Sequence, residues 1–159
     1  MVTILRSVPS MEKENALRLI ESSSRREHSL LVSKIMTVLS DAHGESNLNW
    51  ELAGLLHDLD YDATIDERGL HGEKAAEALT GLVDESVLHA IKSHDHRAGY
   101  KPSSLLDNSL QFADAVSILL RESEDVLDEK PWVKEIIEEY QLPNGLSLPE
   151  LIRMFSESL

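Results

Sequence analysis

The sequence predicts an all-α fold, and two observations support this class. Apolar residues recur three and four positions apart in several segments, which is the spacing of one face of a helix. Capping signals precede several of these segments, and glycine or proline separates them. We find no internal repeat, low-complexity tract or linker, so residues 1–159 are expected to form one domain.

The first half of the chain is expected to contain four helices. Residues 11–21 form the first, and the second starts at Ser24–Glu27 (SRRE), which fits a capping box, and stops at Gly44. A third helix covers residues 49–59, a polar loop covers 60–70, and a short helix covers 72–80. The first eight residues are expected to form a short strand or a loose arm.

The second half is also expected to be helical. Asp84 caps one helix, residues 94–102 (HDHRAGYKP) form a loop, and a long helix covers residues 104–122. Pro131 opens another helix, and Ser147–Glu150 (SLPE) is a second capping box. The apolar residues of 131–159 either complete the core or form a homodimer interface, and the sequence leaves both alternatives open.

Composition restricts the kind of partner. The formal net charge of −14 repels nucleic-acid backbones, so no nucleic acid polymer is expected to bind. No apolar run approaches the roughly 18 residues that a membrane span needs. The N-terminal residues do not form a secretory signal. We therefore expect a cytoplasmic protein with no membrane partner.

The stretch LLHDLDYD, residues 55–62, places a histidine and three aspartates directly after an apolar run. Burying such groups costs several kcal/mol unless they are paired or coordinate an ion. The chain has no cysteine, so any metal must be held by His, Asp and Glu. Ligand-type side chains occur at the ends or on the inward faces of five predicted helices, which is how helical bundles build metal sites: His28, His57, Asp58, His71, His94 and Asp114.

This ordered set resembles the HD superfamily of metal-dependent phosphohydrolases. The local contexts LLHDLDYD, LHGEKAAEAL, AIKSHD and QFADAVSILL are similar too, and the resemblance covers residues 25–122, with residues 131–159 as additional C-terminal helices. It implies an HD-domain-like helical bundle with a metal site in its core. It also implies that one metal is held by four residues, which are His28, His57, Asp58 and Asp114.

By the same resemblance, His71 and His94 hold a second metal that Asp58 bridges to the first. The cofactors expected are one or two divalent ions, with Mn, Fe, Mg, Ni, Co and Zn as candidates. The implied activity is hydrolysis of a small phosphomonoester or phosphodiester, with a nucleotide as one candidate, by a metal-activated hydroxide. A di-iron oxygenase of the same fold and a non-catalytic nucleotide-binding sensor are the alternatives.

Further residues near these ligands are candidates for the chemistry. Asp58 is expected to act in catalysis as the bridging ligand, and Asp60 to orient water or act as a general acid. Lys74, Arg97 and Lys101 are candidate phosphate-binding residues, and ordinary surface cations are the alternative reading. The other three histidines of the chain are not expected to be ligands.

Overall fold

The structure, a computed structural model, describes residues 11–45, 47–123 and 125–156, and every regular element in these ranges is a helix. The predicted all-α class is therefore confirmed, and the expectation for residues 1–8 lies outside the described residues. The elements are α1 Lys13–Leu19, α2 Arg26–Ala42, α3 Leu48–Leu56, the short 3-10 helix η1 Arg68–Leu70, α4 Glu73–Leu79, α5 Glu85–Ser93, α6 Leu105–Arg121, α7 Val126–Glu129, α8 Pro131–Glu139 and α9 Leu148–Ser156.

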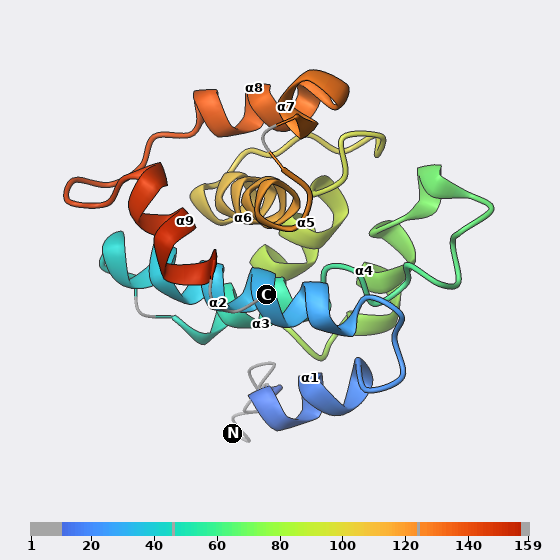
Figure 1. The fold of residues 1–159 in the computed structure, drawn as a ribbon. Coiled ribbons are helices and arrows are strands. Elements are labelled where there is room, and N and C mark those ends of the chain that lie inside the picture. Colours follow the sequence, from blue (N-terminus) through green and yellow to red (C-terminus); the bar gives the residue numbers. More distant parts are fainter. Residues whose placement is uncertain (1–10, 46, 124, 157–159) are drawn as a thin grey trace.

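Helix α6 lies at the centre of the fold. It packs against α2, α3, α5, α8 and α9, while α1 packs on α3 and α4 packs on α5. Figure 1 shows α6 almost along its axis, with α2 and α3 on one side and α7 and α8 on the other. Ligands on α2, α3, α5 and α6 can therefore meet. None of the helices among the described residues combines the length and apolarity needed to cross a bilayer.

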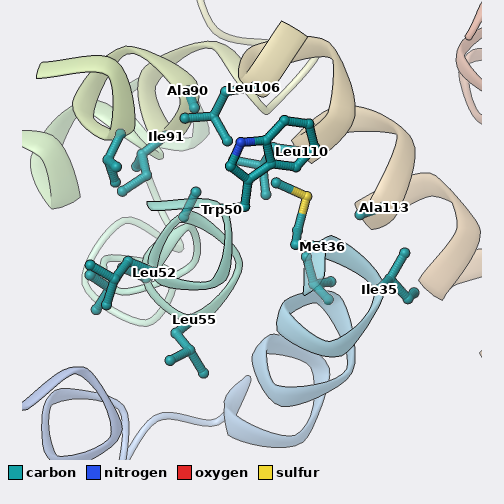
Figure 2. Packing of buried hydrophobic residues seen from close by; sticks show 14 of the residues in the cluster. Ile35, Met36, Trp50, Leu52, Leu55, Ala90, Ile91, Leu106, Leu110 and Ala113 are labelled. Carbon is teal, nitrogen blue, oxygen red and sulfur yellow. The ribbon is translucent and has the colours of Figure 1, made fainter. Parts of the chain in front are cut away.

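The hydrophobic core forms where these central helices meet. Figure 2 shows Trp50 of α3 next to Met36 of α2 and Leu110 of α6, and all three side chains are buried. Leu151 and Phe155 of α9 join the same core. Of the two alternatives for the C-terminal apolar residues, the structure therefore supports completion of the core, and a homodimer stays a prediction.

The start of α2 differs from the prediction. Its N-cap residue is Arg25, which makes no side-chain capping bond, so the capping box at Ser24–Glu27 is wrong. The reason is a competing partner: the backbone N–H of Ser24 donates to Oδ2 of Asp62 over 3.0 Å, and the Ser24 hydroxyl donates to the other oxygen of that carboxylate. These bonds hold the loop after α3 beside the first turn of α2.

Two other predicted helix starts agree with the structure. The Asp84 side chain accepts a hydrogen bond from the backbone N–H of Ser86 over 2.9 Å and caps α5. The backbone N–H of Glu150 donates to the Ser147 hydroxyl over 3.3 Å at the start of α9. Two features differ: α3 ends at Leu56 rather than near residue 59, and the sequence pattern did not predict α7.

Two glycines allow the close packing that the site needs. A Cβ on Gly54 would lie 2.6 Å from the Cα of Ser33, so a side chain here would push α3 away from α2. Gly72 has φ +89°, and a Cβ there would lie 2.6 Å from the carbonyl oxygen of Ile91. This glycine therefore lets the segment that carries His71 approach the end of α5.

Candidate metal centre

The six residues predicted as ligands all lie at one place in the fold, at helix ends or on inward faces. His28 lies in the first turn of α2, and His57 is the C-cap residue of α3 with Asp58 directly after it. The other three approach from different elements: His71 lies between η1 and α4, His94 is the C-cap residue of α5, and Asp114 belongs to α6. All are buried except Asp114, which is partly exposed.

The first group of donor atoms consists of Nε2 of His28, Nε2 of His57, Oδ1 of Asp114 and Oδ2 of Asp58. The two Nε2 atoms lie 3.2 Å apart. Nε2 of His28 lies 2.9 Å from the Asp114 oxygen and 3.4 Å from the Asp58 oxygen. Nε2 of His57 lies 3.4 Å from the Asp58 oxygen and 3.8 Å from the Asp114 oxygen.

The second group consists of Nε2 of His71, Nε2 of His94 and the other oxygen of Asp58. The two nitrogens lie 3.2 Å apart, and Oδ1 of Asp58 lies 2.9 Å from His71 and 3.4 Å from His94. The carboxylate of Asp95 is next to this group, with Oδ2 at 4.0 Å from Nε2 of His71. Asp58 therefore faces one histidine pair with each of its two oxygens.

In His57 and His94, the hydrogen bond made by Nδ1 determines which ring nitrogen carries the lone pair. Nδ1 of His57 donates to the carbonyl oxygen of Gly54 over 2.7 Å, and Nδ1 of His94 donates to that of Ile91 over 2.6 Å. A carbonyl oxygen only accepts, so in each neutral ring the hydrogen is on Nδ1 and Nε2 carries the lone pair.

His28 follows the same pattern through a hydroxyl. The Ser117 hydroxyl donates to the carbonyl oxygen of Asp114 over 2.7 Å, so it accepts from Nδ1 of His28, which lies 3.3 Å away. When both rings are neutral, the facing Nε2 atoms of His28 and His57 are therefore two acceptors and not a hydrogen-bonded pair. Lone pairs at this distance repel each other unless a cation lies between them.

This donor set fits divalent metal ions. Ligand atoms bound to one ion at about 2.1 Å are separated by about 3.0 to 3.4 Å in octahedral or tetrahedral geometry. The contacts of 2.9 to 3.8 Å in the first group and 2.9 to 3.4 Å in the second lie close to that range. Imidazole and carboxylate donors suit Zn, Fe, Ni, Co and Mn. The two histidine pairs can therefore hold one ion each, with Asp58 between them.

The ionisation of the cluster favours cations. Burial lowers the pKa of His57 to about 4, so its ring is neutral near pH 7 and free to coordinate. Burial opposes the charge on Asp58, but His57, His71 and His94 hold its pKa well below the ordinary value. Burial also opposes the charge on His71, but its hydrogen bonds to Asp58 and Asp60 raise its pKa to about 9. The negative charges of Asp58 and Asp60 that favour a proton on His71 also favour a bound metal cation.

Asp60 does not face the cluster directly. Its Oδ1 accepts a hydrogen bond from Nδ1 of His71 over 2.6 Å, and its Oδ2 accepts from the backbone N–H groups of Gly72 and Ala75 over 2.8 Å each. Both oxygens accept hydrogen bonds, so Asp60 fixes the orientation of the His71 ring. This arrangement supports a positioning role for Asp60, and the predicted catalytic role stays a prediction.

A cavity of about 600 Å³ opens onto the cluster. Of the three predicted phosphate-binding cations, Arg97 lines this cavity, whereas Lys74 and Lys101 do not. Lys74 lies on the exposed side of α4, with its Nζ 3.6 Å from a carboxylate oxygen of Glu77, and Lys101 is exposed in the loop between α5 and α6. These two lysines are close to the ligands in sequence only, so their assignment to substrate binding is not retained.

Sequence reasoning missed two charged residues beside the cluster. Nε of Arg25 donates to Oδ2 of Asp58 over 3.2 Å, and its guanidinium lies 4.8 Å from the centre of the Tyr61 ring. The Asp95 carboxylate is held by the Arg97 side chain, from Nε over 3.0 Å and from Nη2 over 2.7 Å. Their sequence positions could have indicated them, because Arg25 precedes His28 by one helical turn and Asp95 follows His94 directly.

Fold and site together define a helical protein with a two-part histidine–aspartate centre suited to divalent ions. The family model of the HD domain matches residues 25–119, which is more than half of the chain. The chain therefore belongs to the HD-domain family, as the sequence motifs predicted. No curated protein and no solved structure matched the chain.

Proposed function

We propose that the protein is a metal-dependent phosphohydrolase that acts on a small phosphomonoester or phosphodiester. The observation that carries this proposal is the carboxylate of Asp58, whose two oxygens each lie within 3.4 Å of a different histidine pair. Divalent ions bound at such a pair of sites lower the pKa of water and neutralise phosphoryl oxygens, which is the chemistry that phosphoester hydrolysis requires.

The charge of the centre suits an anionic substrate on an acidic protein. Two divalent ions against ionised Asp58 and Asp114 leave a net charge of about +2, because neutral imidazoles add none. Burial opposes the charge of Asp95, but hydrogen bonds from Arg97 lower its pKa to about 2. Arg97 offsets this extra negative charge, so the cavity stays attractive to phosphate.

Two guanidinium groups are placed to bind the phosphoryl oxygens. Arg25 uses Nε for Asp58, so its terminal Nη groups are left to contact a phosphoryl group at the cluster. Arg97 uses Nε and Nη2 for Asp95 and keeps Nη1 for a substrate in the cavity. Both arginines line the cavity, so they can orient the phosphate of the substrate. The Nδ1 hydrogen bonds of His71 and His94 hold these two rings in place.

The test is metal analysis followed by a phosphoester panel. The full chain is purified without chelator or affinity metal, its metal content is measured, and phosphate release is assayed with Mn, Mg, Ni, Co, Fe and Zn. Asp58→Ala is expected to abolish phosphate release and lower the metal content, because it removes an oxygen from each group. Asp66→Asn is the matched control, because it removes an exposed carboxylate from the same loop, and it should leave both unchanged.

Other outcomes would indicate another function. Stoichiometric iron with oxygen consumption and no phosphate release would identify an oxygenase. Tight nucleotide binding without turnover under any metal would identify a sensor. Full activity of Asp58→Ala would contradict the bridging role on which the proposal depends.

A further inference from the structure

We propose that Trp132 and His96 form an aromatic wall that binds a planar ring of the substrate. The protein would then prefer phosphoesters whose alcohol carries a nucleobase or another aromatic ring. This inference rests on the proposed phosphohydrolase function and names the substrate class of the same site.

The two side chains come from separate parts of the chain and stack on each other. His96 lies in the loop after α5, and Trp132 lies in the first turn of α8. Their ring centroids are 4.3 Å apart and their planes are inclined by only 17°. Both side chains line the cavity, where His96 is exposed and Trp132 is half-buried. The pair therefore contributes flat aromatic surface to the cavity wall.

The stacked pair lies beside the metal centre rather than at a distant edge. Nδ1 of His96 is 3.7 Å from Oδ1 of Asp95, and the other oxygen of Asp95 is 4.0 Å from Nε2 of His71. One carboxylate thus separates the aromatic pair from the second histidine pair. A substrate whose phosphoryl group lies at the cluster must extend its alcohol portion into the cavity that this pair helps to line.

The rest of this wall offers apolar surface and charged side chains of both signs. Ile118 and Arg121 of α6 and Lys130, just before α8, line the same cavity. The volume of about 600 Å³ lies within the range of small-molecule sites and exceeds what a bare phosphate would fill. The wall thus combines an aromatic face, an aliphatic side chain, two cations and the carboxylate of Glu122, to which Lys130 donates over 3.1 Å.

Stacking distinguishes an aromatic ring from an aliphatic group of similar size. A base stacked on an aromatic side chain contributes roughly tenfold to a hundredfold in affinity, with little dependence on the identity of the base. Trp132 lies outside residues 25–119, which match the family. His96 lies within the matched segment, so the Trp132 half of the wall is the part that the family match does not cover.

The first experiment measures binding before turnover begins. Adenosine 5′-monophosphate and ribose 5-phosphate share a phosphate and a sugar, and only the first has a base. Each compound is added to the Mn²⁺-loaded full chain, and the tryptophan fluorescence is recorded immediately after the addition. The chain has two tryptophans, and the other one, Trp50, is buried in the core. Adenosine 5′-monophosphate should quench the emission and ribose 5-phosphate should not, and Trp132→Phe should lose the quench.

The second experiment measures phosphate release from the same two compounds. Trp132→Ala should lower kcat/KM for adenosine 5′-monophosphate about tenfold more than for ribose 5-phosphate, and Trp132→Phe should restore most of the difference. Far-UV circular dichroism and thermal melting check that each variant folds. Tyr100→Ala is the control, because Tyr100 is an exposed aromatic residue of the loop that carries His96 and does not line the cavity.

The outcomes separate this inference from the proposed function. Hydrolysis of both compounds, with Trp132→Ala lowering both equally, would overturn the aromatic wall and leave the hydrolase intact. Quenching through Trp132 without phosphate release under any metal would support the wall and overturn the hydrolase. Absence of both quenching and hydrolysis would overturn both.

Discussion

Nδ1 of His71 lies 2.6 Å from Oδ1 of Asp60, and this contact turns Nε2 of the same ring toward Asp58. Such a carboxylate fixes the ring orientation and raises the basicity of the coordinating nitrogen. Asp60→Asn should therefore weaken Mn²⁺ binding at the His71–His94 pair by about 10- to 100-fold, with little change at the His28–His57 pair. Calorimetric titration with Mn²⁺ measures both sites, and equal weakening of the two would contradict the positioning role.

The two histidine pairs should lose metal separately. His71→Ala removes a donor of the second group only, so it should reduce the bound metal from two ions to one. His28→Ala should deplete the first group instead. His89→Ala is the control, because this imidazole lies outside the cluster and bonds to Asp107 over 2.6 Å. Metal content per chain is the measurement, and loss of both ions or of neither from His71→Ala would show that the division into two pairs is wrong.

Arg97 should act on substrate binding more than on the chemical step. Arg97→Ala removes a guanidinium from the cavity, so KM for an anionic substrate should rise about five- to tenfold, while kcat falls less. Lys74→Ala and Lys101→Ala remove cations that do not line the cavity and should leave KM within about twofold. Steady-state kinetics on the preferred phosphoester measure this difference. An unchanged KM in Arg97→Ala would show that Arg97 does not bind the substrate.

Metal binding at the second pair should depend on pH. The pKa of His71 is raised above its ordinary value of 6.5 to about 9, so the ring is protonated at pH 7 to 8 and must release a proton to coordinate. The apparent affinity should fall by about tenfold for each pH unit from 9 down to 7. The pKa of His57 is lowered to about 4, so this ring is already neutral and the first pair should change little. Calorimetry in buffers of different ionisation enthalpy counts the protons, and an equal pH dependence of the two pairs would contradict the assignment.

Gly72 should be essential for the second pair. Gly72→Ala would place a Cβ 2.6 Å from the carbonyl oxygen of Ile91 and 3.5 Å from the His94 ring, at a φ of +89°. We expect a loss of stability of about 1 to 3 kcal/mol and a larger loss of metal at the second pair than at the first. Gly69→Ala is the control, because a Cβ there meets nothing within 4 Å. Thermal melting and metal analysis test both expectations, and wild-type metal content in Gly72→Ala would contradict them.

Much of the fold could be predicted from the sequence, because helix propensity and apolar spacing are local. The spacing of Leu106, Leu110 and Ala113 predicted α6, and their faces are buried in the structure. The capping box predicted at Ser24–Glu27 is wrong because of a tertiary contact. The competing partner of Ser24, Asp62, is 38 residues away, and no local pattern reveals that contact. Short α7 buries little, so its pattern gives a weak signal.

The candidate ligands could be predicted because their order and local contexts carry a family pattern, whereas their neighbours are set by packing. Lys74 follows His71 by three residues, yet it projects from the exposed side of α4. Asp60 was expected to do chemistry, but the fold directs both of its oxygens to His71 and the start of α4. Trp132 lies 61 residues beyond His71 in sequence, and only the packing of α8 beside α6 brings it to the cavity.

The wide separation of the ligands along the chain affects how the protein matures. His28 and Asp114, whose side chains lie 2.9 Å apart, are 86 residues apart in sequence. During synthesis on the ribosome, the first group of donor atoms is complete only after most of the polypeptide has emerged and α6 has packed against α2. Ion binding at the first group would therefore follow the docking of α6 against α2.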